Sequence, residues 1–235
     1  MIAVVFGSSG GIGRALILRL LAAGTHTRVF AVSRSGTSIP GAENRQADFT
    51  DETALTALAA EIGAAGPVTL CLIASGLLSD DAVQPEKTYR AQSLQAFQRV
   101  FEANTFAPAL IAKHMLPLMP KTGRSVFAAL SARVGSISDN RLGGWHAYRA
   151  SKAALNMLIR NYAIEQARRA PECICVGLHP GTVDTGLSKP FQSNVPGERL
   201  FTPAQSAGYL LDVIDRLTPE ASGKCLDWAG KDVPS

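Results

Sequence analysis

IAVVF, residues 2–6, runs directly into GSSGGIG, residues 7–13, so a short apolar segment ends in a glycine-rich turn. The residues that follow have helical spacing, with Leu16, Leu20 and Ala23 on one predicted face. Glycines let backbone N–H groups approach a phosphate that a side chain would block, and a helix N-terminus adds partial positive charge. This order of strand, turn and helix predicts a site for the pyrophosphate of a nucleotide.

The rest of the chain alternates strand-like and helical segments. Several strand-like runs are continuously apolar, which is typical of parallel strands covered on both faces. Apolar strands are predicted at residues 2–6, 28–33, 68–74, 125–130 and 174–178. Helices are predicted at residues 14–23, 52–62, 94–119, 147–169 and 204–217. We therefore expect one doubly wound α/β domain over residues 1–235, with a parallel sheet and helices on both faces.

Composition and charge narrow the class of protein. With 46% hydrophobic and 18% charged residues, the 235-residue chain can bury a substantial core, which excludes a disordered protein. No apolar run approaches the roughly 20 residues of a membrane span, and no secretory signal is visible, so we expect a cytoplasmic protein without membrane partners. The net charge of +4 comes from scattered Lys and Arg, which argues against nucleic-acid binding. The four cysteines form no CxxC, so we expect buried thiols and no metal site.

Tyr148 and Lys152 stand four residues apart in a predicted helix, on the same face. A nearby cation favours the phenolate and lowers the pKa of a tyrosine, which makes Tyr148 a candidate acid/base near neutral pH. Taken alone, YxxxK is frequent by chance and usually marks a solvated helix face. The pair gains meaning only from the segments around it.

Those segments resemble the short-chain dehydrogenase/reductase family over essentially the whole chain. The GxxxGxG spacing of residues 7–13 and the YxxxK pair stand in the family's order. Asn104, in FEANT, matches the family's asparagine, and Ser131, after the strand at 125–130, matches its serine. Residues 47–50, ADFT, are similar to the aspartate turn at adenine, and residues 179–185, HPGTVDT, to the turn around the nicotinamide.

Three further segments are similar to the bacterial branch called C-factor-like. They are residues 131–133, residues 143–152 and the closing LDWAG at residues 226–230. The resemblance as a whole implies a Rossmann fold and an oxidoreductase that interconverts a carbonyl and an alcohol.

The resemblance also implies site roles. Tyr148 exchanges a proton with the substrate oxygen, and Lys152 holds the nicotinamide ribose and lowers the pKa of Tyr148. Ser131 hydrogen-bonds the carbonyl oxygen, and Asn104 holds a water that links Lys152 to solvent. Besides Tyr148 and Lys152, the implied cofactor contacts are Gly7, Ser9, Gly11, Ile12, Gly13, Ser33, Arg34, Asp48, Ala74, Pro180, Gly181, Val183 and Thr185.

Some positions depart from the family pattern or allow a second interpretation. Phe6 stands where the family usually has threonine, and LIASG at residues 72–76 replaces its asparagine-rich segment. Ser131 lies 17 positions before Tyr148, a longer gap than is common in the family, and the common spacing falls on Gly135. The rivals to Ser131 are Ser136 and Ser138. Asp48 also fits a turn or helix cap, and Thr185 a plain loop hydroxyl; His179 is expected in the cofactor turn and not as an acid/base.

The predicted second strand is followed by Ser33-Arg34-Ser35, without the acidic residue that accepts the ribose hydroxyls of NAD. A guanidinium can bind a 2′-phosphate, so NADP(H) is favoured over NAD(H), although Gly10 supplies no second cation. The sequence thus predicts an NADP(H)-dependent oxidoreductase acting on a medium-sized, partly apolar carbonyl under a substrate loop at residues 186–203. It is expected to form a homodimer or homotetramer.

Two other functions stay open at this point. One is a weakly active or inactive NAD(P)-binding protein that works by interaction or signalling. The other is an epimerase or dehydratase on a related fold, for which few residues remain after Thr185.

Overall fold

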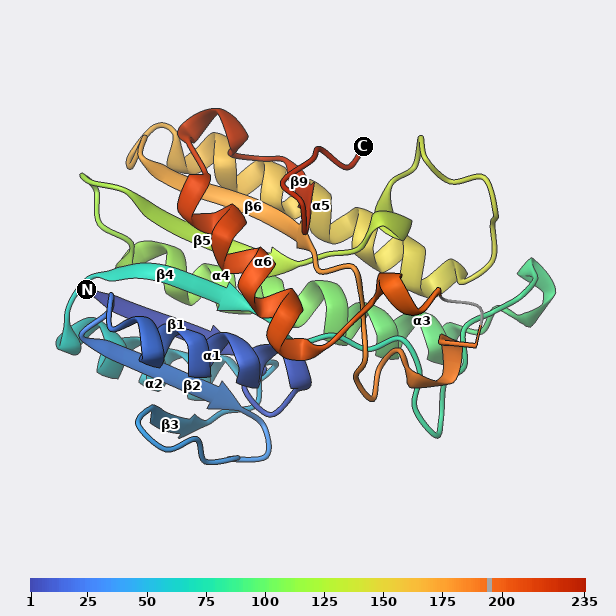
Figure 1. Cartoon of the computed structure of the whole chain (residues 1–235), viewed down its shortest axis with the longest axis horizontal. Coiled ribbons are helices and arrows are strands. Elements are labelled where there is room, and N and C mark those ends of the chain that lie inside the picture. Colours follow the sequence, from blue (N-terminus) through green and yellow to red (C-terminus); the bar gives the residue numbers. More distant parts are fainter. Residues whose placement is uncertain (194–195) are drawn as a thin grey trace.

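The computed structural model describes residues 1–193 and 196–235 of the chain. At its centre is a seven-stranded parallel sheet in the order β3-β2-β1-β4-β5-β6-β9 (Figure 1). A short parallel pair joins β7 (Thr182–Val183) to β8 (Leu200–Phe201). The strands of the central sheet are β1 (Ile2–Phe6), β2 (Arg28–Ser33), β3 (Glu43–Gln46), β4 (Val68–Ile73), β5 (Ser125–Leu130), β6 (Cys173–His179) and β9 (Cys225–Asp227).

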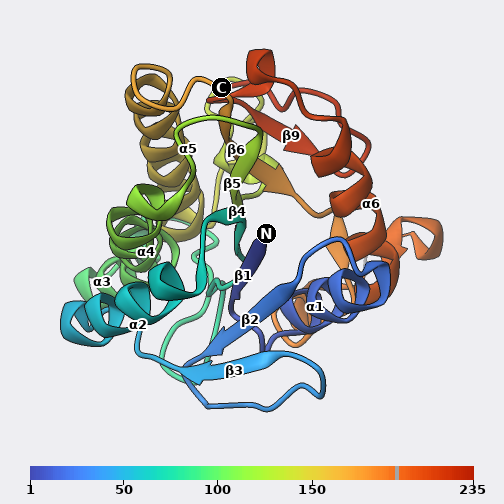
Figure 2. The same cartoon turned by 90° about the vertical axis from the view of Figure 1, so that its left-hand side faces the viewer.

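Helices cover both faces of this sheet. Figure 2 shows α2, α4 and α5 on one side and α1 and α6 on the other, which confirms the doubly wound α/β fold. No helix in the described residues is both long enough and apolar enough to cross a membrane. The α-helices are α1 (Gly11–Ala23), α2 (Glu52–Ala65), α3 (Leu94–Phe101), α4 (Ala107–Met115), α5 (His146–Gln166) and α6 (Pro203–Arg216).

The core consists of two apolar layers divided by the sheet. Along β1, Val4 and Phe6 join the layer beneath α2, α4 and α5, whereas Ala3 and Val5 join the layer beneath α1 and α6. This alternation explains why the strand sequence is apolar at every position. On α1, Leu16 and Leu20 are buried as predicted.

The prediction that Ala23 shares the buried face of α1 was wrong. Ala23 is exposed because α1 ends there, and Gly24 (φ 63°) turns the chain away. Ile17 is the further apolar residue that packs into the core from this helix.

The helix predicted over residues 94–119 is interrupted. Between α3 and α4, residues 102–106 form a π-helical turn, and a 3-10 turn at Leu116–Leu118 follows α4. Pro117 lies in that last turn, consistent with the predicted end of the helix. π-helical turns are rare and occur mostly as single turns inside longer helices, and the sequence reasoning therefore ran one helix through this one.

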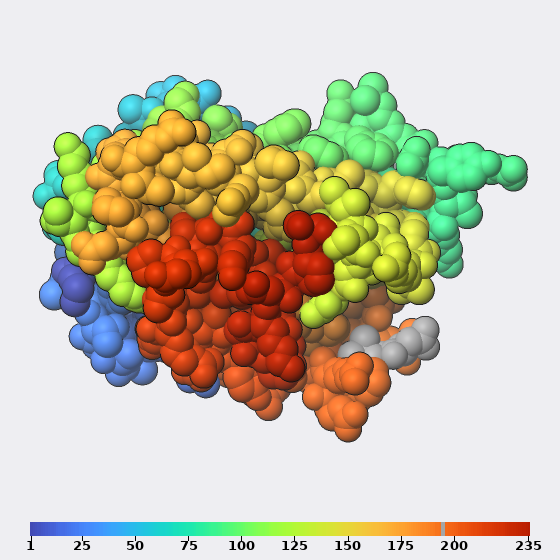
Figure 3. Space-filling model, turned by 90° about the horizontal axis from the view of Figure 1, so that it is seen from above, coloured from blue at the N-terminus to red at the C-terminus, as the bar shows by residue number. Residues whose placement is uncertain are grey.

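Two short strands of the sheet were not predicted. β3 is polar throughout and lies at one edge, where Glu43 forms an ion pair with Arg28 of β2. β9 is three residues long and lies at the opposite edge beside β6. In the space-filling view of Figure 3, the red C-terminal segment lies against the gold α5 region and the yellow-green loop before it. Ser138 of that loop donates its N–H to the carbonyl oxygen of Ser235.

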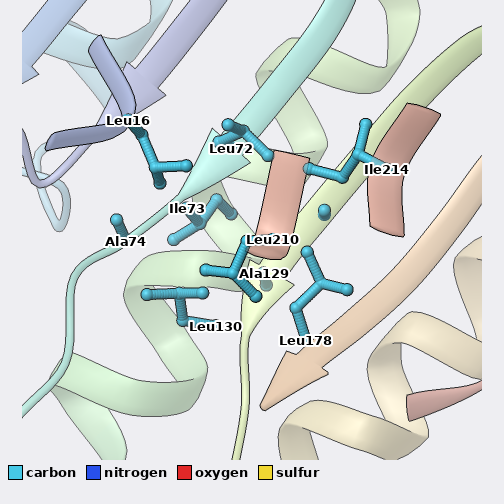
Figure 4. Close-up of a pocket in the computed structure, with 10 residues that line it drawn as sticks. Leu16, Leu72, Ile73, Ala74, Ala129, Leu130, Leu178, Leu210 and Ile214 are labelled. Carbon is cyan, nitrogen blue, oxygen red and sulfur yellow. The ribbon is translucent and has the colours of Figure 1, made fainter. Parts of the chain in front are cut away.

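A small cavity lies between the sheet and helices α1 and α6. Its volume is about 10 Å³, and its walls are apolar side chains, among them Leu16, Leu72 and Leu210 (Figure 4). A water at such a site would need two or more polar partners. The cavity is therefore a packing gap of the core.

Candidate active site

A pocket of about 750 Å³ opens at the carboxyl ends of β1, β4, β5 and β6. Its walls are drawn from residues 9–12, 74–78, 130–134, 145–152 and 179–191. The order of strands reverses between β1 and β4, and ligands of open parallel sheets bind at such reversals. The fold thus gathers into one pocket segments that are far apart in the sequence.

The glycine turn between β1 and α1 forms one wall of this pocket. A Cβ on Gly13 would lie 2.2 Å from the carbonyl oxygen of Gly7, and a Cβ on Gly7 (φ 87°) would lie 2.7 Å from the Ser75 nitrogen. No side chain caps the N-terminus of α1, and its first turn holds no acidic residue. These N–H groups are thus free for an anion, so the residues present fit the pyrophosphate of a dinucleotide.

Phe6 has a packing role in place of the threonine hydrogen bond. Its ring meets that of Phe49 edge-on, with the centroids 5.6 Å apart. Asp48, the neighbour of Phe49, accepts hydrogen bonds from the Thr50 N–H and hydroxyl, which hold the pKa of Asp48 below its usual value. Asp48 therefore forms the turn that the sequence allowed, and its contact with adenine stays a prediction. The cap of α2 is Asp51.

The predicted cofactor residues fall into three groups in the structure. Gly7 and Gly13 belong to the glycine turn but do not line the pocket, and Ser33, Arg34 and Asp48 lie outside the pocket, at or after the ends of β2 and β3. Ser33 is buried and accepts the Thr37 N–H, whereas Arg34 is exposed. The predicted contacts that line the pocket are Ser9, Gly11, Ile12, Ala74, Tyr148, Lys152, Pro180, Gly181, Val183 and Thr185.

Tyr148 and Lys152 both lie in the first two turns of α5 and line the pocket. The Lys152 Nζ lies 5.9 Å from the centroid of the Tyr148 ring and donates to the Leu130 carbonyl oxygen at 2.8 Å. Burial raises the pKa of Tyr148 to about 12 and lowers the pKa of Lys152 to about 8. The expected lowering of the pKa of Tyr148 by Lys152 is thus not found here, because burial of the phenol dominates.

Asn104 lies in the π-helical turn and is fully buried. Its amide exchanges two hydrogen bonds of 2.8 Å with the Leu77 backbone and donates a third to the Ser151 hydroxyl. A Cβ on Gly76 would lie 3.3 Å from Asn104 Oδ1 and 3.7 Å from Lys152 Nζ. The structure therefore brings Asn104 and Lys152 together on either side of Gly76.

Ser131 lines the same pocket, but its hydroxyl donates to Asn156 Oδ1 at 2.7 Å. Of its rivals, Ser136 accepts the Asp139 N–H, and neither Ser136 nor Ser138 lines the pocket. Gly135 packs on α5, where a Cβ would lie 2.8 Å from the Cβ of Lys152. The hydrogen bond from Ser131 to the substrate carbonyl stays a prediction.

The sequence reasoning missed Glu86, which contacts the start of α5. Trp145 (φ 51°) is the non-glycine residue with positive φ in the described residues, and its N–H donates to the Glu86 carbonyl oxygen. The buried Glu86 carboxylate accepts the Ala147 N–H, where the helix dipole favours negative charge. Glu86 lies in a polar segment without a motif, far from α5 in the sequence, so no sequence signal could have assigned it to the start of that helix.

Trp145 also forms part of the pocket wall. Its ring lies 6.2 Å from that of Tyr148 and 5.2 Å from that of Phe191, centroid to centroid. Phe191 belongs to the predicted substrate loop at residues 186–203, of which residues 194–195 lie outside the described part of the chain. Leu187 and Ser188 of the same loop line the pocket.

His179 lies at the end of β6 and lines the pocket. Burial and the nearby Arg133 lower the pKa of His179 to about 4, so the imidazole is neutral at ordinary pH. All four cysteines are free and buried. The described residues hold no group of three His, Cys, Asp or Glu side chains that could bind a metal ion.

A family model described as short chain dehydrogenase matches residues 1–196. The chain belongs to the short-chain dehydrogenase/reductase family. This confirms the resemblance seen in the sequence and the class of NAD(P)-dependent dehydrogenases and reductases.

Two similar family members come from bacteria. The chain is 38% identical over 128 residues to 1-hydroxy-2-glutathionyl-2-methyl-3-butene dehydrogenase of a Rhodococcus species. This alignment covers 54% of the chain and 53% of that protein. It is 36% identical over 136 residues to C-signal of Myxococcus xanthus, and that alignment covers 58% of the chain and 76% of C-signal. The first alignment thus spans about half the length of the Rhodococcus dehydrogenase.

Among solved structures, the chain is similar to NADPH-bound carbonyl reductase from chicken fatty liver. The TM-score is 0.84 at 26% identity, over 99% of this chain and 98% of that one. The Sniffer carbonyl reductase of Drosophila melanogaster, at 22% identity and a TM-score of 0.84, supports the fold alone. The short-chain dehydrogenase fold is therefore present over the whole length of this chain.

Proposed function

We propose that this short-chain dehydrogenase/reductase is an NADP(H)-dependent enzyme that interconverts a carbonyl and an alcohol by hydride transfer, with Tyr148 as general acid/base. The observation that carries the proposal is one pocket lined by Tyr148 and Lys152, with the buried Asn104 beside Gly76 and Lys152 and an uncapped glycine turn as another wall. A phenol, an ammonium and an anion site within one cavity suit proton and hydride transfer to a bound substrate.

The residues proposed to hold the cofactor are those that line the pocket, together with Arg34. The glycine turn would bind the pyrophosphate, Arg34 the 2′-phosphate, and Lys152 the nicotinamide ribose. When bound, NADPH supplies the hydride. Thr185 packs within reach of the turn, because a Cβ on Gly11 would lie 2.9 Å from its Cγ2.

The protonation state of Tyr148 suits its role as the proton donor when a carbonyl is reduced. With a pKa of about 12, its phenol is protonated at neutral pH and can donate the Oη proton to the carbonyl oxygen. Lys152, with a pKa of about 8, carries a positive charge at neutral pH and stabilises the phenolate that remains. Asn104, fixed by Leu77, is proposed to hold the water that returns the proton.

The substrate end of the pocket is apolar. Leu78, Val134, Trp145, Leu187 and Phe191 line it. Hydrophobic walls with one polar group at the reacting atom suit a medium-sized carbonyl compound with apolar substituents. We propose that residues 186–203 cover this substrate, since both Leu187 and Phe191 come from that segment.

The oligomeric state, the domain organisation and the location of the protein are also proposals. Met157 and Ile164 are exposed on one face of α5, 62% and 44% respectively, and Phe106 is exposed just before α4. Exposed apolar side chains of this kind mark interfaces, so we propose a homodimer or homotetramer through α4 and α5. We also propose one domain over residues 1–235 and a cytoplasmic location, where the four free cysteines stay reduced.

A panel of aldehydes and ketones with NADPH tests the proposed function. We expect NADPH oxidation with at least one apolar carbonyl, and a fall of about 10³-fold or more for Tyr148→Phe, which removes the proton donor. NADPH binding, followed by fluorescence, serves as the control and should change little. Equal turnover by both proteins would overturn the mechanism, and cofactor binding without turnover would favour the interaction or signalling role.

A further inference from the structure

Two consecutive residues after β5 point to opposite sides. The Ser131 N–H donates to the Leu178 carbonyl oxygen at 2.8 Å, so the ladder with β6 continues past the end of β5. Ala132 is extended, with φ −151° and ψ 147°. Successive side chains of an extended chain lie on opposite faces. Whatever Ser131 faces, Ala132 therefore faces away from it.

The Ser131 hydroxyl faces α5. The residue is only 4% exposed, and its Oγ donates to Asn156 Oδ1 at 2.7 Å, a normal length for O–H···O. A hydroxyl carries one proton, and an amide oxygen only accepts. The single proton of Ser131 is thus already bound, whereas a substrate carbonyl oxygen would need that proton for itself.

The side of Tyr148 is occupied by Ala132. Ser131, Ala132 and Tyr148 all line the pocket, but of the two residues after β5 it is Ala132 that packs in one apolar cluster with Ala147 and Tyr148. No residue in the described part of the chain hydrogen-bonds the Tyr148 hydroxyl. The residue after β5 that packs near the Tyr148 phenol is thus Ala132, whose side chain is a methyl group without a hydrogen-bond donor.

Asn156 continues the face of α5 that carries Tyr148 and Lys152, since the three are four residues apart. The Lys152 Nζ donates to the Leu130 carbonyl oxygen, and the next residue along, Ser131, bonds Asn156 one helical turn later. Leu130 and Ser131 therefore hold successive turns of α5 against the end of β5.

We propose that Ser131 is a positioning residue that holds α5 through Asn156, and that Tyr148 meets the substrate carbonyl oxygen without a serine hydroxyl because Ala132 stands on its side. This inference rests on the proposed function and replaces the contact that the family resemblance implies for Ser131. The substrate oxygen then receives one hydrogen bond from the chain, that of Tyr148.

Ser131→Ala, Asn156→Ala and Ala132→Ser test the inference by steady-state kinetics. Loss of a donor that contacts the reacting oxygen costs about 10²–10³-fold in kcat. For a positioning role, Ser131→Ala and Asn156→Ala should each lower kcat/KM by only about threefold, and the double variant by no more than either. Ala132→Ser, which adds a hydroxyl facing the pocket, should raise kcat/KM by about tenfold. A 100-fold loss for Ser131→Ala but not for Asn156→Ala would overturn the inference.

A second measurement does not depend on turnover. The pKa of Tyr148 is followed by NMR of ring-labelled tyrosine in the protein with NADP⁺, with Tyr148→Phe assigning the signal. Ala132→Ser should lower the pKa of Tyr148 because its hydroxyl donates to the phenolate, and Ser131→Ala should leave it in place. The reverse pattern would refute the inference. If no carbonyl is turned over, the proposed function fails, and this titration still decides the place of Ser131.

Discussion

Replacement of Lys152 by methionine should remove a pH dependence of stability that the burial of this lysine creates. Burial lowers the pKa of Lys152 from 10.5 to about 8. Below pH 8 the folded protein therefore holds a charged ammonium in a place that disfavours it. This cost disappears as the pH rises towards 10.5, because the unfolded chain then binds a proton that the folded chain has released.

The size of the effect follows from the same two pKa values. At about 1.4 kcal/mol for each pKa unit, the shift from 10.5 to about 8 corresponds to about 3 kcal/mol. The free energy of unfolding of the wild-type protein should therefore rise by about 3 kcal/mol relative to Lys152→Met between pH 7 and pH 10.5. The lost hydrogen bond to Leu130 lowers the stability of the variant by a similar amount at each pH and cancels from the difference.

Urea unfolding at half-unit steps from pH 7 to pH 10.5 measures this difference. Lys121→Met, which removes an exposed cation, is the matched control for the change in net charge. Curves for wild type and Lys152→Met that run parallel across the range would refute the reasoning, because Lys152 would then be as well hydrated folded as unfolded. A fall of wild-type stability relative to the variant would reverse the sign and refute it equally.

Three further variants test other parts of the account. Gly13→Ala should destabilise the fold by about 1–3 kcal/mol in urea unfolding and abolish NADPH binding, because its Cβ would lie 2.2 Å from the Gly7 oxygen. Gly10→Ala, whose Cβ would lie 3.4 Å from the same atom, is the control, and equal effects would contradict the proposed packing of the turn. Arg34→Asp should raise KM for NADPH about tenfold or more, because it removes a charge-assisted hydrogen bond to the 2′-phosphate, and KM for NADH should stay the same or fall. An unchanged preference between NADPH and NADH would show that Arg34 does not contact the cofactor. Glu86→Ala should lower stability by about 1–3 kcal/mol by uncovering the buried Ala147 N–H, and Glu86→Gln should lose less, since it keeps an acceptor; equal losses would assign the effect to charge.

The fold was largely predictable because its strands are continuously apolar. β1, β2 and β5 have the predicted bounds, since both faces of each strand are covered and all of their residues except Arg28 and Leu130 are buried. β3 was not predicted from the sequence because an edge strand needs no apolar face, and its ENRQ sequence is typical of a polar loop. The interruption between α3 and α4 was not predicted because a single π-helical turn is rare and lacks the Gly or Pro residues that mark a helix end.

The sequence predicted which residues form the site better than it predicted their pKa values and orientations. The sequence order indicated Asn104, Ser131, Tyr148 and Lys152, and all four are grouped at one end of the sheet. The direction of the pKa shift of Tyr148 was wrong because burial depends on segments such as Leu78 and Phe191, whose approach no local pattern reveals. The orientation of the Ser131 hydroxyl depends on a single alternation along β5, and a spacing argument cannot resolve it.

Transfer of deuterium from NADPH that carries deuterium at both C4 positions to the product tests the central claim most directly. With a carbonyl from the panel and saturating labelled NADPH, the wild-type protein should yield an alcohol that carries deuterium on the former carbonyl carbon. Tyr148→Phe, at equal cofactor occupancy, should yield about 10³-fold less of it. An unlabelled alcohol from the wild type, or equal labelled product from the variant, would contradict hydride transfer with Tyr148 as the proton donor.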